Sequence, residues 1–154
     1  MSNQFNNASL FSGWGGGDSG FHKAGFDTLL GVDNDKHSRE CFKLNFPLAD
    51  VQAWDLSKVK AAFILHHLGL TQLALDSLVI SAPCTGISKA GKGDPYNKLN
   101  ILYLRSITHF IPGLKPCMFL MENVPMEGDM RVFYSIVEKL NFSIVGRGIG
   151  EPQI

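Results

Sequence analysis

Short apolar runs alternate along the chain with longer amphipathic stretches. The apolar runs predict strands near residues 8–11, 28–33, 51–54, 77–82, 118–124 and 142–146. The amphipathic stretches predict helices near residues 18–24, 35–45, 57–70, 97–110 and 129–140. This alternation is typical of βαβ units, in which a helix joins two parallel strands. We therefore expect an α/β fold with a doubly wound, mostly parallel sheet.

The length and composition are those of one domain. The chain has 154 residues, of which 45% are hydrophobic, and this is enough to bury a core. No internal repeat or low-complexity linker divides it, so we expect a single unit over residues 1–154. The formal net charge is zero, so the chain lacks the overall basic field that holds nucleic acid. A nucleic-acid partner would have to be held locally or by a second module.

Cysteine usage and the apolar runs bear on the compartment. The three cysteines form no CxxC pair, which argues against a disulfide framework and a zinc site. Cys41 and Cys117 are expected to be small buried apolar groups. The adjacent His66 and His67 cannot share one face of a helix, so no metal site is predicted there. No apolar run reaches membrane-spanning length and no signal peptide is evident, so we expect a cytoplasmic protein with no membrane partner.

Two predicted strands end in reactive side chains. Pro83 and Cys84 follow the apolar run 77–82, and Glu122 and Asn123 follow the run that begins at residue 118. Ligands bind at the carboxyl edge of open α/β sheets, so a thiol and a carboxyl group would face one crevice. Such a pair suits an enzyme that adds sulfur to an electron-poor ring while an acid neutralises the developing charge.

A glycine-dense segment, residues 13–20, leads from the first predicted strand into a helix. Glycines let a ligand approach the backbone, and a helix start favours a negative group. Gly15, Gly17 and Gly20 satisfy the GxGxxG spacing of dinucleotide-binding proteins, and Asp33 ends the second strand. In so glycine-rich a segment that match is nearly automatic. A nicotinamide or flavin site and an unliganded turn both remain open on this evidence.

The wider pattern resembles the cytosine-5 DNA methyltransferases. Residues 8–26 are similar to the family's first cofactor motif, with Phe11, Gly13, Gly15 and the pair Ala24-Gly25 in the matching places. Later segments resemble further motifs of the family in the same order: Asp33, Asp55-Leu56, Pro83-Cys84 with Ser88, Glu122-Asn123-Val124, and residues 150–153. The resemblance therefore runs through nearly the whole chain.

This resemblance implies the fold of S-adenosylmethionine-dependent methyltransferases and that cofactor. By similarity, Phe11, Gly13 and Gly15 would line the methionine half, Asp33 would bind the ribose hydroxyls, and Asp55 with Leu56 would contact adenine. The family often has an aromatic residue after the ribose acid, but this chain has Asn34, which predicts weaker affinity. The alternative role for Asp55 is to cap the helix expected from residue 57.

The resemblance also implies roles in catalysis. Cys84 would be the nucleophile that adds to carbon 6 of cytosine, and Glu122 the acid at ring nitrogen 3. Pro83, Ser88 and Asn123 would contact the substrate, a cytosine flipped out of double-stranded DNA. RNA stays open as a substrate because relatives share this core.

The printed sequence stops one residue after Gln153. The arginines of the family's Gln-x-Arg-x-Arg motif and the target-recognition region are therefore expected to be missing from it. Two functions follow. The chain is the catalytic portion of a methyltransferase, either completed by a second polypeptide or represented only in part by this sequence, or it is an inactive remnant that binds cofactor or a partner. We expect little methyl transfer by the chain alone, because nothing in it supplies base-edge readout.

Overall fold

The computed structural model of the chain describes residues 5–83, 98–123 and 138–139. The described elements are β1 (Phe5–Leu10), α1 (Gly16–Lys23), β2 (Phe26–Val32), α2 (Lys36–Asn45), β3 (Asp50–Gln52), α3 (Ala61–Leu68), β4 (Ser77–Ile80), α4 (Lys98–Arg105), a π-helix η1 (Ser106–Phe110), α5 (Ile111–Leu114) and β5 (Met118–Met121). The strand expected at 142–146 and nearly all of the helix expected at 129–140 lie outside the described residues.

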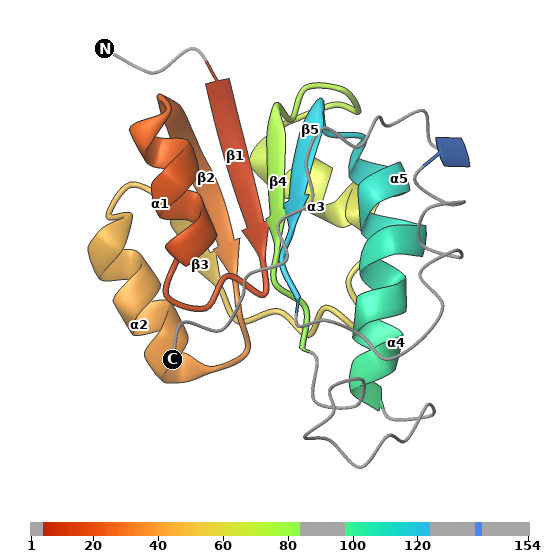
Figure 1. Cartoon of the computed structure of the whole chain (residues 1–154), viewed down its shortest axis with the longest axis horizontal. Helices are drawn as coiled ribbons and strands as arrows, with labels where there is room; N and C mark the ends of the chain where they lie inside the picture. The colour runs from red at the N-terminus through yellow and green to blue at the C-terminus, as the bar shows by residue number, and fades with distance from the viewer. Residues whose placement is uncertain (1–4, 84–97, 124–137, 140–154) are drawn as a thin grey trace, which may run out of the picture.

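The described strands form one parallel sheet with the order β3-β2-β1-β4-β5. The chain starts at the centre with β1, moves outward to β2 and β3, and then returns to place β4 on the other side of β1. The direction of winding thus reverses between β1 and β4. This confirms the expected α/β class and the doubly wound parallel sheet. All five carboxyl ends share one edge, which is the lower edge in Figure 1.

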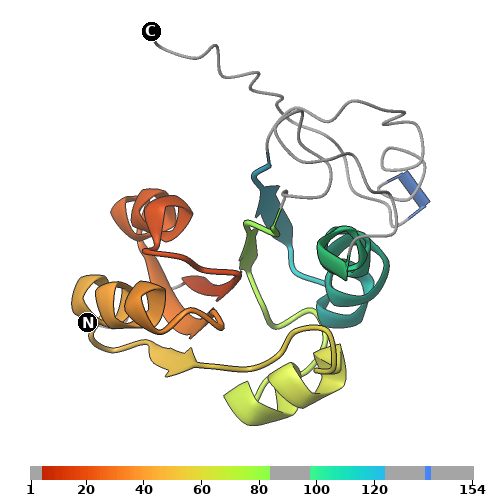
Figure 2. The ribbon, with the colours of Figure 1, turned by 90° about the horizontal axis from the view of Figure 1, so that it is seen from below.

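Helices cover the sheet on both faces (Figure 2). The helices α1 and α2 lie on one face, and α3, α4 and α5 lie on the other. The larger core lies under α3 and α4 and contains the fully buried side chains of Leu10, Leu30, Ile80 and Phe110. A smaller cluster lies under α2 and is built on Phe42. No helix among the described residues is both long enough and apolar enough to cross a membrane.

The first strand begins three residues earlier than its apolar pattern predicts. Asn6 and Asn7 belong to β1 although both are polar, because each has partners in the fold. The backbone N–H of Asn6 donates to Asp76 Oδ2 at 2.7 Å, and its side chain donates to the Ala74 carbonyl at 3.0 Å. Amide side chains can be buried in a strand when they are hydrogen-bonded. The hydropathy pattern alone does not include these polar residues, so it predicts a later start for the strand.

The helix expected at 97–110 continues to Leu114 but changes its hydrogen bonding on the way. Pro112 has no N–H, and its ring would crowd the carbonyl four residues earlier in an α-helix. The preceding turn, η1, is wound as a π-helix, and the Ile111 N–H bonds to the Ser106 carbonyl five residues back. The wider turn therefore lets the helix pass the proline without ending.

The α2 packing depends on glycine in the neighbouring strand. A Cβ placed on Gly31 in β2 would lie 2.4 Å from Cε1 of Phe42, whose side chain is fully buried. A Cβ on Gly20, in the middle of α1, would meet nothing within 4 Å. One glycine is therefore required by packing, and the other is not.

We expect Gly31→Ala to lower the free energy of unfolding by about 1–3 kcal/mol, because the buried Phe42 ring has to move. Gly20→Ala is the matched control, and we expect it to raise stability by about 0.5–1 kcal/mol through helix propensity. Urea denaturation of both variants measures the difference. Equal effects of the two substitutions would contradict the packing argument.

Candidate functional site

A cleft opens at the carboxyl edge of the sheet, where the winding reverses. Its volume is about 140 Å³. Its lining residues come from the ends of β1, β2, β3 and β4 and from α4: Phe11, Asp33, Asn34, Trp54, Asp55, Leu56, Pro83 and Leu102. Five of the residues that the sequence analysis selected, Phe11, Asp33, Asp55, Leu56 and Pro83, thus lie around one cavity. This is the place where open α/β sheets bind ligands.

The glycine loop after β1 has a special backbone. Phe11, Gly13 and Gly15 all have positive φ, at 54°, 52° and 87°. The left-handed region suits glycine, whereas phenylalanine rarely adopts it. The Ser12 N–H donates to the Val32 carbonyl at 3.0 Å, so the loop is attached to the end of β2. The strained turn therefore places the Phe11 side chain at the cleft.

Gly15 is required for packing as well as for its backbone angle. A Cβ at this position would lie 2.3 Å from Cε2 of Phe46 and 3.1 Å from Cδ2 of Phe42. Neither Gly13 nor Gly15 lines the cleft, and the backbone amides of both have hydrogen-bond partners within the protein. The Gly13 N–H donates to Asp33 Oδ2 at 2.9 Å, and the Gly15 N–H donates to the Ser12 carbonyl at 2.9 Å. These two glycines shape the loop that leads to the cleft.

Asp33 follows β2 and joins two loops at the cleft. Its Oδ2 accepts from the Gly13 N–H, and its Oδ1 accepts from the Asp35 N–H at 2.9 Å. The Asp33 N–H itself donates to the Gln52 carbonyl at the end of β3, at 3.1 Å. A carboxylate has about four acceptor sites, so these two bonds leave capacity for hydroxyl donors of a ligand.

Asp55 lines the cleft and also organises its own turn. Its Oδ1 accepts from the Ser57 N–H at 3.0 Å and from Ser57 Oγ at 2.6 Å, and Lys58 Nζ lies 3.1 Å from Oδ2. The hydrogen bonds from Ser57 and then Lys58 lower the pKa of Asp55 to about 2. The helix begins at Ala61 rather than at residue 57. The alternative role of Asp55 as the cap of that helix is therefore wrong, because Asp55 closes a separate turn before it.

Two side chains from α4 and η1 hold the turn that follows β3 in place. Arg105 Nε donates to the Leu56 carbonyl at 2.9 Å, and its Nη2 donates to the Val59 carbonyl at 2.5 Å. His109 Nε2 accepts from the Ala61 N–H at 3.2 Å and so caps α3. The α4–η1 helix thereby fixes the part of the cleft that carries Asp55 and Leu56.

Glu122 and Asn123 lie beside the Pro83 side of the cleft. The Glu122 N–H donates to the Ile80 carbonyl at 3.0 Å. Asn123 Nδ2 donates to the Ala82 carbonyl at 3.0 Å. The two strand ends that carry the predicted thiol and acid are thus held together, and the Glu122 side chain is exposed at this edge. Cys84 itself, Ser88 and residues 150–153 lie outside the described residues.

The other two cysteines are not buried as expected. Cys117 is exposed and Cys41 is half-buried. Cys117 comes just before β5, where its N–H donates to the Leu75 carbonyl at 3.0 Å. Its backbone is paired although its side chain faces solvent, so the expectation that apolar character would bury it was wrong.

A buried polar network supports the glycine loop, and the sequence analysis missed it. Asp18, in the first turn of α1, is only 1% exposed. Its Oδ1 accepts from Asn7 Nδ2 at 2.6 Å, and its Oδ2 accepts from Ser9 Oγ at 2.9 Å. Ser77 Oγ donates to Asn7 Oδ1 at 2.7 Å, which brings β4 into the network. The polar residues Asn7 and Ser9, two positions apart in a buried strand, were the sequence signal that could have indicated this network.

The cleft has the groups that S-adenosylmethionine requires. Asp33 offers a carboxylate for ribose hydroxyls, Leu56 offers apolar surface for a base, and Phe11 offers apolar surface for the methionine half. In the glycine loop, Ser12 is 7% exposed, and its Oγ has no hydrogen-bond partner within the part of the chain that the structure describes. A buried hydroxyl without a partner is unusual in a folded protein. The residues present fit the cofactor that the motifs imply.

Comparison with known proteins gives one family. A model described as "C-5 cytosine-specific DNA methylase" matches residues 5–142. The chain is 37% identical over 120 residues to the type II methyltransferase M.AquIA of Picosynechococcus. It is 34% identical over 121 residues to the type II methyltransferase M1.HphI of Haemophilus parahaemolyticus. Each match covers 75% of this chain, but only 47% of M.AquIA and 31% of M1.HphI.

Solved structures agree on the fold. A protein of E. coli assigned as a prophage-encoded DNA modification methyltransferase superposes with a TM-score of 0.71 and 28% identity, over 89% of this chain and 36% of that one. The Entamoeba histolytica methyltransferase EhMeth gives a TM-score of 0.67 at 21% identity, over 88% of this chain and 43% of that one. A TehB-like SAM-dependent methyltransferase from Corynebacterium glutamicum gives 0.52 at 14% identity, over 91% and 66%. The fold is that of S-adenosylmethionine-dependent methyltransferases.

We expect Asp18→Ala to lower the free energy of unfolding by about 2–4 kcal/mol, because Asn7 and Ser9 lose their buried acceptor. Asp18→Asn is the matched control, because its oxygen still accepts from Asn7 while its amide donates to Ser9. We expect the Asn variant to lose less than about 1 kcal/mol at neutral pH. Denaturant titration of the three chains tests this order.

The wild type and Asp18→Asn also provide a test of how stability depends on pH. Burial raises the pKa of Asp18 above 3.8, although the bonds from Ser9 and Asn7 oppose the shift. The folded state therefore holds the proton more tightly than the unfolded state does. As pH rises from 3.8 through the raised value, the wild type should lose stability relative to Asp18→Asn. A difference that does not change with pH would contradict a buried ionisable carboxyl at this position.

The His109 cap predicts the opposite pH dependence. Burial and then the nearby Arg105 guanidinium hold the pKa of His109 below 6.5. The neutral ring accepts from the Ala61 N–H, so its contribution is present above pH 6.5 and is lost as pH falls through the lowered value. Relative to His109→Gln, which keeps an acceptor, the wild type should lose about 1 kcal/mol on acidification. Stability curves that stay parallel across this range would rule out the cap.

Proposed function

Because the chain belongs to the C-5 cytosine-specific DNA methylase family, we propose that it transfers a methyl group from S-adenosylmethionine to carbon 5 of cytosine in DNA. The chain spans less than half of the two curated relatives described above, so this activity is proposed for the protein of which it forms the cofactor-binding and catalytic part.

One observation carries the proposal. The bond from Asn123 Nδ2 to the Ala82 carbonyl joins the loop that leads into Cys84 to the loop that carries Glu122. Pro83, between Ala82 and Cys84, lines the cleft. A nucleophile that directly follows Pro83 and an acid that directly precedes Asn123 would therefore act on one ring. This supports the pairing of the two groups, which the sequence alone suggested from two separate strand ends.

The chemistry explains why a thiol and a carboxyl group are both needed. Carbon 5 of cytosine is a poor nucleophile. In the proposed reaction the Cys84 thiolate forms a bond to carbon 6 while the Glu122 carboxyl holds a proton at ring nitrogen 3, so electron density moves to carbon 5. Carbon 5 would then bond to the methyl group, with S-adenosylhomocysteine as the leaving group. Transfer of the carbon 5 proton to a base such as water re-forms the double bond between carbons 5 and 6, breaks the bond from carbon 6 to the Cys84 sulfur and restores the thiolate. The base has to leave the duplex to reach these groups.

The cofactor would occupy the other end of the cleft. S-adenosylmethionine, when bound, supplies the methyl group on its sulfonium. In the proposal Asp33 binds the ribose hydroxyls, Phe11 lies along the methionine half, and Leu56 with Asp55 contacts the base. Gly13 and Gly15 shape the loop that positions Phe11. Ser88 and Asn123 are proposed to contact the cytosine together with Pro83.

A second function is favoured by the partial coverage of the relatives. The chain would then bind cofactor or a partner polypeptide and would transfer no methyl group by itself. In this second function, another polypeptide would supply target recognition for the active state. Formal net charge is zero, which leaves DNA binding by this chain dependent on local contacts.

Duplex DNA in which 5-fluorocytosine replaces cytosine tests the reaction. The fluorine cannot leave as a proton does, so the carbon–sulfur bond stays formed. With S-adenosylmethionine present, we expect a denaturant-resistant adduct that Cys84→Ala abolishes. Glu122→Gln should slow its formation about 100-fold or more. The full chain is assayed alone and then together with the carboxyl-terminal part of a full-length relative.

Cys117→Ala is the matched control, because this cysteine is exposed and lies at the opposite end of β5 from Glu122. It should form the adduct at the wild-type rate. An adduct only in the supplemented assay would favour an enzyme completed by a second polypeptide. No adduct in either assay, from a chain that still binds S-adenosylhomocysteine, would favour the non-catalytic alternative and overturn the proposed reaction.

A further inference from the structure

Trp54 lines the cleft, although no motif in the sequence drew attention to it. It follows β3 by two residues and precedes Asp55, and its side chain is half-buried. Asn34 lines the same cleft, at the position where the family that the chain resembles often has an aromatic side chain. The described part of the cleft has two aromatic lining residues, Phe11 and Trp54. They follow different strands, β1 and β3.

Two rings from α3 hold the Trp54 side chain. Phe63 meets it edge-to-face, with ring centroids 5.1 Å apart and an interplanar angle of 70°. His67 meets it at 4.9 Å and 88°. These are favourable geometries for aromatic pairs. The indole therefore has neighbours that limit its rotation.

The bracing histidine is itself anchored to the strand that leads into Trp54. His67 Nε2 lies 2.5 Å from Asp50 Oδ2, and Asp50 is the first residue of β3. Partial burial would raise the pKa of Asp50, but hydrogen bonds from His67 and Gln52 outweigh this and lower it. The carboxylate is thus an ionised acceptor for the ring. Strand, helix and indole form one connected unit.

We propose that Trp54 supplies the aromatic surface for the adenine ring of the cofactor, in place of an aromatic side chain at position 34. This inference rests on the proposed function, since it takes the nucleoside of S-adenosylmethionine as the ligand. Asp33 and Asp55 lie on the same cleft, so a base against Trp54 has a ribose acid and a polar neighbour within one cavity. A braced indole loses little freedom when it stacks on a base.

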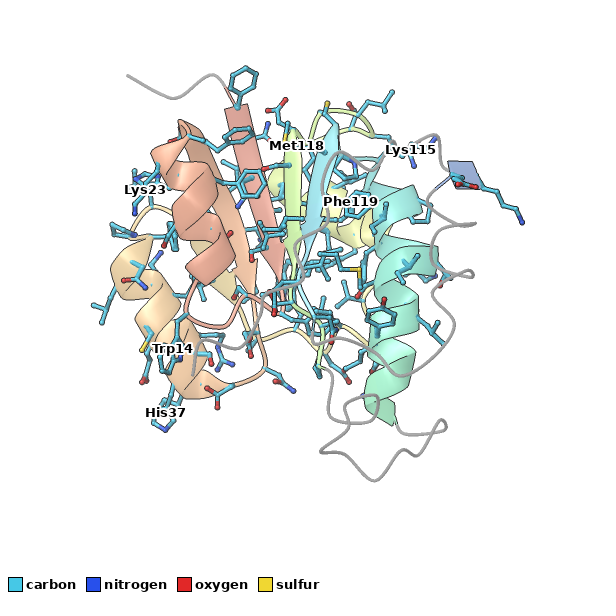
Figure 3. All side chains as sticks on the ribbon, in the orientation of Figure 1. Trp14, Lys23, His37, Lys115, Met118 and Phe119 are labelled. Atoms are coloured by element: carbon cyan, nitrogen blue, oxygen red, sulfur yellow. The ribbon has the colours of Figure 1, made fainter. Side chains whose placement is uncertain are left out.

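Calorimetric titration of the full chain with S-adenosylhomocysteine tests the proposal. We expect Trp54→Leu to weaken binding about tenfold to a hundredfold, in line with the loss of one base–aromatic stack. Trp54→Phe keeps a ring and should lose less. Trp14→Leu is the matched control, because the Trp14 side chain is 70% exposed beside α2 (Figure 3) and is not among the residues that line the cleft. This variant should bind as the wild type does.

Ligand fragments separate the two halves of the site. Adenosine should show the same loss with Trp54→Leu, whereas methionine should bind both chains equally. Equal affinity of wild type and Trp54→Leu for S-adenosylhomocysteine would overturn the inference and leave the proposed function standing. Failure of the wild type to bind S-adenosylhomocysteine would overturn both.

Fluorescence gives a second readout that needs no change at Trp54. The chain has two tryptophans, so Trp14→Phe leaves Trp54 as the single indole. Adenine stacking should quench its emission as S-adenosylhomocysteine is added. In Trp54→Phe the remaining Trp14 should show no such change. A ligand that binds the Trp14→Phe chain without altering its emission would argue against contact with Trp54, whether or not Trp54→Leu folds.

Discussion

Every candidate group in this protein depends on β1 lying at the centre of a parallel sheet. Since the chain moves outward from β1 in both directions, the ends of β1 and β4 separate into different connections, and a cleft opens between them. Backbone bonds then join neighbouring strand ends: Ser12 to Val32, Asp33 to Gln52, Ser81 to Leu10 and Glu122 to Ile80. Residues more than a hundred positions apart in sequence, such as Leu10 and Glu122, thereby reach one edge.

The centre of the sheet is held by polar contacts as well as by apolar packing. Burial of Asp18 raises its pKa, so the carboxylate form is disfavoured there, yet its two bonds define how α1 starts relative to β1. An apolar side chain could fill the same space but would have no directional contact with Asn7 and Ser9. The hydrogen bonds of Asp18 to Asn7 and Ser9 therefore define the geometry of the glycine loop between β1 and α1. Arg105 and His109 serve the neighbouring turn in the same way, from the opposite face of the sheet.

Hydropathy and turn chemistry predicted the described fold well, and they failed where tertiary partners decide. The parallel class, the strand ends and the acids at Asp33 and Glu122 follow from local pattern. The early start of β1 does not, because Asn6 is stabilised by Asp76, seventy positions away. The late start of α3 depends on His109, which no local signal near Ala61 reveals. The sequence does not decide whether Trp54 is a core residue or a pocket wall, and the fold places it on the cleft that Asn34 also lines. Cys84 and Ser88 stay predictions.

Phe11 occupies a conformation that phenylalanine adopts only under constraint. With φ at 54°, it costs the folded chain about 1–2 kcal/mol relative to an unstrained residue. Glycine would relieve that strain and would also remove the ring from the cavity wall. The strained backbone at Phe11 therefore places one wall of the pocket in position before a ligand binds. Binding against this wall then needs little rearrangement of the Phe11 backbone, which lowers the free-energy cost of ordering the pocket.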